Sequence, residues 1–428
     1  MSQLIVGFAG MTHLGLVSGV ATAERGFQVV CFDPEAARVA ALRKGVLPVS
    51  EPLLDDLLRS NQARLTFTCD SAALGVCDVV YVAPDVATDD QGSSDLTTIN
   101  QLLEVVFAAT RPQTVIVVLS QVPPGFTRAH AQTGRHLFYQ VETLIFGRAV
   151  ERALHPERYI VGCSQPSDPL PEAFAAVLSA NNCPILAMRF ESAELAKISI
   201  NFCLVASVST ANTLAEICEN VGADWSEIVP ALKLDRRIGQ YSYLAPGLGI
   251  AGGNLERDLA TVINLAGESG ADVSVVEAWL ANSRHRRDWA LRTLYRELLA
   301  KCSDPVIAVL GLAYKQDTHS TKNSPSIALL GSLTPFRVRV FDPVVPPTAT
   351  AHPRCHGAAS ALEACEGADA LVIMTPWGQF SQVPPDEIAD RLRGRLVIDP
   401  YRILPPGDCA AAGLRYVTLG AAPEEPGK

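Results

Sequence analysis

The chain of 428 residues lacks the features that mark a nucleic-acid-binding, membrane-spanning or secreted protein. Asp and Glu outnumber Lys and Arg by 45 to 35, and the net charge of −10 excludes an extended basic surface for nucleic acid or an anionic membrane. No run of roughly eighteen apolar residues predicts a membrane span, because Ser, Thr and Asn interrupt the apolar segment 202–215. The opening residues MSQLIVGFAG contain no basic stretch or cleavage site, so we expect no signal peptide.

The cysteines also lack any arrangement typical of a metal centre. The eleven cysteines form no CxxC pair or other metal-ligand spacing, so we expect no metal and mainly structural, reduced thiols in a cytoplasmic protein. Hydrophobic residues make up 48% and charged residues 19% of the chain, which is typical of a globular protein rather than a disordered one. The length is sufficient for two or three domains with buried cores.

The opening segment has the residue order of a dinucleotide-binding βαβ unit. An apolar strand precedes the turn Gly10-Met-Thr-His-Leu-Gly15, a helical pattern follows to Arg25, and the strand FQVVCFDP ends in Asp33. Gly10 suits the tight turn, and Gly15 lets the helix approach the strand. The helix N-terminus, which begins near His13 and Leu14, is expected to hold the cofactor's pyrophosphate. Asp33 is placed to accept hydrogen bonds from ribose hydroxyls, which favours NAD over NADP.

Thr12 occupies the middle position of this turn, where a glycine lets the backbone approach the pyrophosphate. The side chain is expected to crowd the phosphate or to replace one of its waters. A Rossmann-type fold that has lost its cofactor is the alternative interpretation.

Further apolar runs predict the rest of the fold. Residues 77–84 and 114–125 continue the alternation of buried strands and helices, and residues 306–311 and 336–343 repeat the opening pattern weakly. We therefore expect an α/β protein with two Rossmann-like, doubly wound parallel sheets, joined by a long central helix over 191–221. The expected domains are 1–188 for dinucleotide binding, 189–300 for the central helices with the glycine-rich stretch, and 301–428 for the second Rossmann-like unit.

A glycine-rich stretch, YSYLAPGLGIAGGNLERD over residues 241–258, lies between helical segments. Such a run usually forms a loop whose N–H groups face a ligand, although an ordinary surface loop has the same composition. The stretch resembles the active-site loop PGxGFGGSCFxKD of the UDP-glucose/GDP-mannose dehydrogenases. The matching residues are Pro246, Gly247, Gly249, Gly252 and Asp258, with Arg257 in place of a lysine. The nucleophilic cysteine of the family falls on Asn254.

The resemblance extends to other catalytic segments. SAELAKISINFCLVASVSTAN resembles the family's central helix and places Lys197 and Asn201, one turn apart, at its catalytic lysine and asparagine. A lysine that only extends its charge to solvent at a domain edge is the alternative. VETLIFGRAV resembles PEFLxEGxA, with Glu142 at the first glutamate. TVIVVLSQVPPG resembles the loop beside the nicotinamide, where Ser120 matches and Gln121 replaces the threonine that positions a catalytic water.

The remaining matches imply how substrate and partner bind. GLAYKQDTHSTKNSP resembles GLAFKxxTDDxRxSP, which handles the nucleotide, and Lys315 matches its lysine. Arg237 matches an arginine that reaches the neighbouring subunit's site, which implies a homodimer built on the central helix. The resemblance assigns substrate binding to Tyr243, Gly247, Gly249, Gly252, Arg237 and Lys315. A further helix is expected over 272–299, with the four basic residues 284–287 on a solvated face.

Three functions are compatible with these residues. Asn254 has no nucleophile comparable to a thiolate, so the first is an NAD-dependent oxidoreductase of a nucleotide sugar that performs one two-electron step. Glu142, Lys197, Asn201 and Asp258 suffice for that step. The second is a four-electron dehydrogenase that works through an aldehyde hydrate. The third is a non-catalytic relative that binds a nucleotide sugar or NAD and acts as a regulator or scaffold.

Overall fold

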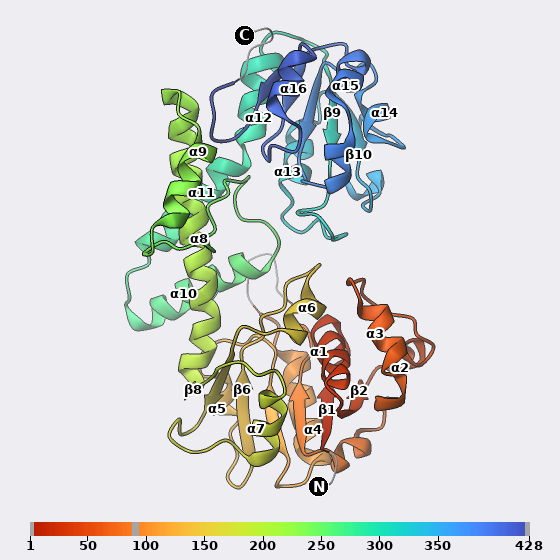
Figure 1. Ribbon diagram of the computed structural model, residues 1–428, viewed down its shortest axis with the longest axis vertical. Coiled ribbons are helices and arrows are strands. Elements are labelled where there is room, and N and C mark those ends of the chain that lie inside the picture. Colours follow the sequence, from red (N-terminus) through yellow and green to blue (C-terminus); the bar gives the residue numbers. More distant parts are fainter. Residues whose placement is uncertain (1–3, 88–93, 424–428) are drawn as a thin grey trace. The chain divides into compact units, whose positions relative to one another are not determined.

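The computed structural model describes residues 4–87 and 94–423, except for the side chains of Asn254 and Glu268. The chain forms two compact units, Met1–Ile200 and Asn201–Lys428, and the boundary falls inside the long helix α8, Phe190–Val221 (Figure 1). Each unit contains its own sheet, as expected for two Rossmann-like domains.

The first unit is built on an eight-stranded sheet. Its strands are β1 (Ile5–Ala9), β2 (Gln28–Phe32), β3 (Leu65–Thr68), β4 (Val79–Val82), β5 (Val115–Val118), β6 (His136–Gln140), β7 (Tyr159–Cys163) and β8 (Ile185–Arg189). They lie in the order β3-β2-β1-β4-β5-β6-β7-β8, and all neighbours are parallel except β6 and β7. The order reverses between β1 and β4, which is where ligands bind in open α/β sheets.

Helices cover both faces of this sheet. They are α1 (His13–Glu24), α2 (Ala36–Arg43), α3 (Leu54–Ser60), α4 (Thr97–Ala109), α5 (Phe126–Ala129), α6 (Ala149–Leu154) and α7 (Glu172–Ser179). Alternate strand residues point to opposite faces, so Phe8 and Tyr81 pack with α1, α6 and α7, while Val80 and Val82 pack with α4 and the start of α8. The sheet is therefore doubly wound, as expected.

The second unit has a six-stranded parallel sheet. Its strands are β9 (Val306–Leu310), β10 (Arg337–Phe341), β11 (Cys355–Gly357), β12 (Ala370–Ile373), β13 (Leu396–Ile398) and β14 (Arg415–Val417). The helices that accompany them are α12 (Trp289–Leu294), α13 (Pro325–Ser332), α14 (Ala361–Cys365), α15 (Pro385–Arg391) and α16 (Pro406–Ala411). The order β11-β10-β9-β12-β13-β14 repeats that of the first six strands, which confirms the weak internal repeat seen in the sequence.

The remaining α-helices are α9 (Trp225–Leu234), α10 (Asn254–Ser269) and α11 (Ser274–Arg287). The helix α8 has 32 residues, about 48 Å in length, and ends before Gly222, which has a φ of +77°. The single helix expected over 272–299 is wrong. Asp288 has a ψ of 6° and separates α11 from α12, which continues into a π-helical turn at Tyr295–Leu299.

The expected solvated face is also wrong at one residue, because Arg286 on α11 is completely buried. Its Nη2 lies 3.0 Å from Glu219 Oε1, and its Nη1 lies 3.3 Å from Glu216 Oε2. Both carboxylates come from α8, so the buried guanidinium is compensated by two acids. Glu219 also accepts hydrogen bonds from the Trp289 indole and the Gly420 N–H, which joins α8 to α12 and to the C-terminal segment.

Within the described residues, α8 is the one helix long and apolar enough to cross a membrane by length and composition. A single helix of this kind is weak evidence, since a core helix of a soluble protein passes the same test. Only 33% of its most apolar 18-residue segment is buried inside the chain, so most of this segment is not covered by other residues of the chain.

Candidate active site

The turn between β1 and α1 has the shape of a dinucleotide-binding turn. Gly10 has a φ of +97°, and a Cβ on it would lie 2.8 Å from the backbone nitrogen of Pro84. A Cβ on Gly15 would lie 1.9 Å from the carbonyl oxygen of Gly10. Both positions therefore require glycine, in keeping with a tight turn and close helix–strand packing.

Asp33, at the end of β2, is buried and helps to shape this turn. Its Oδ2 accepts hydrogen bonds from the Met11 N–H at 2.7 Å and from Arg38 Nη1 at 2.8 Å, while its Oδ1 accepts one from the Glu35 N–H at 2.9 Å. Arg38 also pairs with Glu35 at 2.6 Å. Sequence reasoning missed Arg38, and the signal was a basic residue in the first turn of the helix that follows the acid.

Thr12 points its hydroxyl away from the turn, toward the chain that follows β4. Its Oγ1 accepts the Asp85 N–H at 2.8 Å, and Asp85 Oδ2 accepts the His13 N–H at 2.9 Å. A carboxylate therefore lies at the N-terminus of α1. Sequence reasoning missed Asp85, although an acid directly after β4 is a usable signal, because the carboxyl ends of β1 and β4 meet at the switch point.

Two residues expected to bind the cofactor are engaged inside the domain. The ring of His13 is buried, with Nε2 2.8 Å from Glu51 Oε1, and it stacks on Phe146 with 4.2 Å between ring centroids. Ser120 is buried and donates a hydrogen bond to the Pro84 carbonyl at 2.5 Å. Both side chains support the walls of the turn, and their contact with a cofactor stays a prediction.

The other two expected cofactor residues are Leu14 and Gln121, and both are buried. Leu14 belongs to the hydrophobic core under α1. The geometry of Gly10, Gly15 and Asp33 fits NAD, because a glycine-dependent turn leads into a helix N-terminus beside a buried acid. The N–H of His13 already binds a carboxylate, so a bound pyrophosphate would meet Asp85 at that point.

Lys197 and Glu142 form an ion pair with 2.7 Å between Nζ and Oε1. Their side chains are 12% and 16% exposed, so the lysine is paired rather than extended into solvent. Lys197 Nζ also donates to the Glu142 carbonyl oxygen at 3.1 Å, and Glu142 Oε2 accepts the Leu144 N–H at 2.9 Å. The helix α8 thus carries the cation, and the segment after β6 carries a carboxylate fixed at both oxygens.

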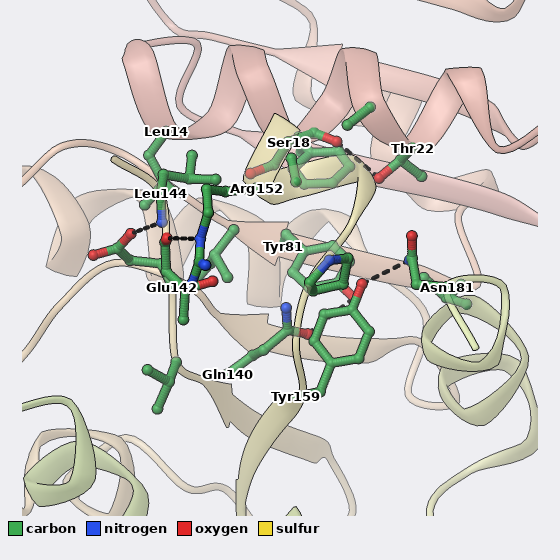
Figure 2. A pocket seen from close by; sticks show the side chains of 18 of the residues that line it. Leu14, Ser18, Thr22, Tyr81, Gln140, Glu142, Leu144, Arg152, Tyr159 and Asn181 are labelled. Atoms are coloured by element: carbon green, nitrogen blue, oxygen red, sulfur yellow. Dashed lines mark hydrogen bonds between the residues drawn. The ribbon is translucent and has the colours of Figure 1, made fainter. Parts of the chain in front are cut away.

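A cavity of about 80 Å³ adjoins Glu142 under α1 (Figure 2). Its polar groups include Gln140, which accepts from the Tyr81 hydroxyl at 3.3 Å, and Tyr159, which accepts from Asn181 Nδ2 at 2.7 Å. This volume admits water molecules and is too small for a dinucleotide. It is therefore not the cofactor site.

Asn201 and Asp258 form the second pair of expected catalytic residues. Asn201 Nδ2 donates a hydrogen bond to Asp258 Oδ2, and Asp258 Oδ1 lies 3.4 Å from Arg257 Nε. Asp258 is 1% and Arg257 6% exposed. The sequence numbers place Asn201 one turn after Lys197 on α8, while α10 positions Asp258.

The glycine-rich loop is fastened to its own unit by side chains. The Gly247 N–H donates to Asn212 Oδ1 at 2.8 Å, and Trp225 Nε1 donates to the Leu244 carbonyl at 2.7 Å. Asn212 is buried on α8, so the same helix that carries Asn201 also holds the start of this loop.

Two further contacts hold the second half of the loop. The Ile250 N–H donates to Ser283 Oγ at 2.7 Å, and Gly249, with a φ of +78°, would place a Cβ 2.4 Å from the Ser283 carbonyl. The Gly252 N–H donates to the Lys322 carbonyl at 3.2 Å. The N–H groups of Gly247, Ile250 and Gly252 are therefore bound to protein. Gly247, Gly249 and Gly252 shape the loop.

The position of the family's cysteine is the first residue of α10, Asn254, whose side chain lies outside the described residues. Arg237 is exposed and forms two hydrogen bonds with the Asp235 carboxylate, at 2.7 and 3.0 Å. Lys315 is half-buried, with Nζ 5.8 Å from the centroid of the Tyr314 ring.

Tyr243 is 53% exposed and lies in the wall of a pocket of about 670 Å³ in the second unit. The wall combines the aromatic side chains of Trp225, Tyr241 and Tyr401 with Lys233 and with the ion pair of Arg402 and Asp224, 2.6 Å apart. Aromatic faces stack on bases and cations attract phosphates, so this pocket has the chemistry to receive a nucleotide.

The chain matches one protein family along most of its length. Residues 4–177 match the UDP-glucose/GDP-mannose dehydrogenase family, NAD binding domain, residues 191–284 match its central domain, and residues 308–406 match its UDP binding domain. A UDP-glucose 6-dehydrogenase of Pseudomonas aeruginosa is 31% identical over 96% of this chain and 96% of its own length. UDP-glucose 6-dehydrogenase TuaD of Bacillus subtilis is 29% identical over 96% of this chain and 92% of its own length.

A solved UDP-glucose dehydrogenase from Pyrobaculum islandicum has the same fold, with a TM-score of 0.84, 25% identity and 98% of both chains covered. A UDP-D-ManNAc dehydrogenase from Pyrococcus horikoshii, at 22% identity and a TM-score of 0.83, supports the fold alone. The glycine turn, the acid after β2 and these matches over nearly the whole chain agree on one assignment. The chain belongs to the UDP-glucose/GDP-mannose dehydrogenase family, whose members are NAD-dependent oxidoreductases of nucleotide sugars, and its cofactor is NAD.

Proposed function

We propose that this protein oxidises one hydroxyl-bearing carbon of a nucleotide sugar by a single hydride transfer and releases the carbonyl product. The observation that carries this proposal is the Lys197–Glu142 ion pair, with 2.7 Å between Nζ and Oε1 and both side chains largely buried. A fixed carboxylate beside a fixed ammonium supplies a base and an oxyanion-stabilising cation at one point.

The proposed step balances in protons and electrons. The substrate hydroxyl gives its proton to Glu142, the C–H bond breaks with loss of a hydride, and a C=O bond forms. Bound NAD supplies the hydride acceptor. Lys197 stabilises the negative charge that develops on the substrate oxygen, while Asn201 and Asp258 hold the substrate through hydrogen bonds.

Asn254 is the reason for proposing that the reaction stops there. In family members with a cysteine at this position, the cysteine attacks the first-formed aldehyde, and the adduct loses a second hydride. A carboxamide is a poor nucleophile, so no covalent adduct forms and the carbonyl leaves. None of the residues 241–258 is a cysteine that could take over this role.

The match to the UDP binding domain supports a nucleotide sugar as substrate. We propose that Tyr243, Arg237 and Lys315 contact its nucleotide portion and that Gly247, Gly249 and Gly252 shape the loop around it. The aromatic and cationic pocket beside Tyr243 supports this assignment. We further propose a cytoplasmic homodimer, with domains 1–188, 189–300 and 301–428.

Absorbance of NADH, followed with a panel of UDP- and GDP-sugars, tests the proposal. We expect one NADH for each sugar consumed and a carbonyl product that a hydrazine reagent traps. Lys197→Ala should lower the rate by a few hundred-fold or more, because loss of a charged oxyanion partner costs about 3 to 4 kcal/mol. Lys44→Ala is the matched control, since Lys44 is exposed at the end of α2.

Two other results would contradict the proposal in different ways. Two NADH per sugar with a carboxylate product would establish the hydrate route and a four-electron reaction. Measurable binding of a nucleotide sugar with no NADH from any member of the panel would establish the non-catalytic alternative.

A further inference from the structure

The N-terminus of α1 is capped by a residue that is distant in sequence. Thr12 is the N-cap residue, with φ −84° and ψ −165°, but its own side chain makes no capping hydrogen bond. The carboxylate of Asp85 takes this place and accepts the His13 N–H at 2.9 Å. The unpaired N–H groups at a helix N-terminus carry a partial positive charge, so an anionic cap is stabilising.

Asp85 is held in this position from both sides. Its own N–H donates to Thr12 Oγ1 at 2.8 Å, so the two segments exchange a pair of hydrogen bonds. The preceding residue, Pro84, is buried, and its carbonyl accepts the hydroxyl of Ser120. The carboxylate therefore reaches the helix from a backbone fixed by Thr12 and Ser120.

A second carboxylate occupies the same turn. The Met11 N–H donates to Asp33 Oδ2 at 2.7 Å, two residues before the His13 N–H that donates to Asp85. Two of the N–H donors that face the start of α1 are thus already bound to negative oxygens of the protein. A dinucleotide pyrophosphate binds at this kind of helix N-terminus through the same donors.

We propose that Asp85 acts as an internal anion that competes with the cofactor's pyrophosphate for the N-terminus of α1 and sets the affinity for NAD. Binding of the dinucleotide replaces the Asp85 carboxylate at the His13 N–H, and the segment after β4 releases its contact with Thr12. The proposal rests on NAD as the cofactor and on the proposed function of the site. It assigns to Asp85 a role in cofactor affinity and none in the hydride transfer.

The test compares Asp85→Asn with the unmodified protein by calorimetric titration of NAD. The amide oxygen of asparagine can still accept the His13 N–H, so the variant removes the charge and keeps the cap. We expect about fivefold tighter binding of NAD, because an anion at a helix N-terminus contributes up to about 1 kcal/mol. Asp168→Asn is the control, since Asp168 is an exposed loop acid in the same unit and its change alters the net charge equally.

Two further measurements identify the cause of the gain. ADP should gain affinity in Asp85→Asn, whereas adenosine, which has no phosphate, should not. Asp85→Ala should lower the melting temperature of the protein without ligand, because α1 loses its cap, and still bind NAD more tightly. A purely structural role for Asp85 would lower the melting temperature and leave the affinity unchanged.

Each remaining outcome separates this inference from the proposed function. Weaker NAD binding in Asp85→Asn would overturn the inference and make Asp85 a ligand of the cofactor. Equal affinity in Asp85→Asn, Asp168→Asn and the unmodified protein would overturn it while the oxidoreductase proposal stands. Absence of NAD binding in all three proteins would overturn both.

Discussion

Lys197 Nζ lies 2.7 Å from Glu142 Oε1, and a second hydrogen bond joins the same nitrogen to the Glu142 carbonyl oxygen at 3.1 Å. The cation and the carboxylate come from different elements, α8 and the segment after β6, so the fold of the first unit fixes their distance. Each charge compensates the other in a largely buried position. A lysine or glutamate buried here without a partner would destabilise the folded protein. The pair therefore holds a carboxylate and an ammonium group side by side at a fixed distance.

The buried guanidinium of Arg286 provides a first prediction, on stability. Arg286→Met should lower the free energy of unfolding by about 3 kcal/mol, because Glu219 would lose its cationic partner in a partly buried site, while Glu216 keeps Arg292 nearby. Arg284→Met, two residues earlier on the exposed face of α11, should change it by less than about 0.5 kcal/mol. Urea denaturation of both variants measures the difference, and equal effects would contradict a role for burial.

The same residue shows what sequence could and could not predict. The alternation of apolar strands and helices predicted both sheets, and the apolar periodicity of residues 191–221 predicted α8 to within one residue. The pairing of Arg286 with Glu219 joins residues far apart in sequence, so four adjacent basic residues indicated only a solvated face. Local sequence pattern predicts the secondary structure, whereas the burial of a charge depends on which distant element packs against it.

The candidate site also combines residues that local sequence predicts with residues that it does not. Gly10, Gly15 and Asp33 were predicted because their spacing within one βαβ unit is itself the signal, and the turn they form has the expected shape. Asp85 and Glu51 were missed, since each reaches its partner, His13, from a distant segment. Glycine spacing predicts the turn, but the side chains that bind it come from the chain after β4 and from the loop before α3, where no local pattern marks them.

Asp33 underlies the second prediction, on cofactor choice. The protein should bind NAD more tightly than NADP, because the buried carboxylate would repel a 2′-phosphate. Arg38 cannot readily offset this repulsion, since it already pairs with Asp33 at 2.8 Å and with Glu35 at 2.6 Å. Calorimetric titration of both cofactors measures the preference, and equal affinity or tighter NADP would disprove it. Asp33→Asn should reduce the difference in affinity between NAD and NADP.

Thr12 underlies the third prediction. Thr12→Gly should tighten NAD binding, because it removes a Cβ from the turn and the acceptor that holds the Asp85 N–H. Thr12→Ser keeps that acceptor and should bind NAD as the unmodified protein does. If both effects act through Asp85, the gain in Thr12→Gly combined with Asp85→Asn will be smaller than the sum of the single gains. If NAD affinity does not rise in Thr12→Gly, the pyrophosphate does not bind next to residue 12 of the turn.

The exposed apolar side chains of α8 underlie the fourth prediction, on assembly. Leu195, Leu214, Ile217 and Val221 are between 39% and 68% exposed in the single chain. A face of this kind on a long helix favours a partner, and the family resemblance implies a second copy of the chain. Light scattering at micromolar concentration should give a dimer or a multiple of one, and a monomer would refute the arrangement.

A pair of variants tests the surface that forms the dimer. Ile217→Asp should shift the protein toward the monomer, because a carboxylate would be buried in the apolar contact. Val76→Asp is the control, since Val76 is 56% exposed in the first unit and lies outside α8. Equal shifts in both variants would point to general destabilisation rather than to an interface on α8.

Two glutamates near the start of α8 have opposite environments. Glu194 is completely buried, and burial raises the pKa of its carboxyl above the usual range, although the N–H groups of Gly125 and Thr127, at 2.6 and 2.8 Å, oppose this shift. Glu191 is 40% exposed, and its hydrogen bond with Arg128 lowers the pKa of its carboxyl. The two groups should therefore change stability with pH in opposite directions.

The fifth prediction follows from these signs. A carboxyl whose pKa is raised by folding binds protons more tightly in the folded state, so its contribution is fully present below the pKa of the unfolded chain and is lost as pH rises through the folded pKa. Glu194→Gln should therefore gain stability relative to the unmodified protein as pH rises from about 4 to 7. Glu191→Gln should lose stability relative to the unmodified protein in a lower window, as pH rises through the lowered folded pKa of Glu191 to the unfolded value of about 4.3, and the difference should stay constant above it. Urea denaturation from about pH 3 to 7 measures both slopes, and equal slopes in the two variants would show that the burial of Glu194 does not control its ionisation.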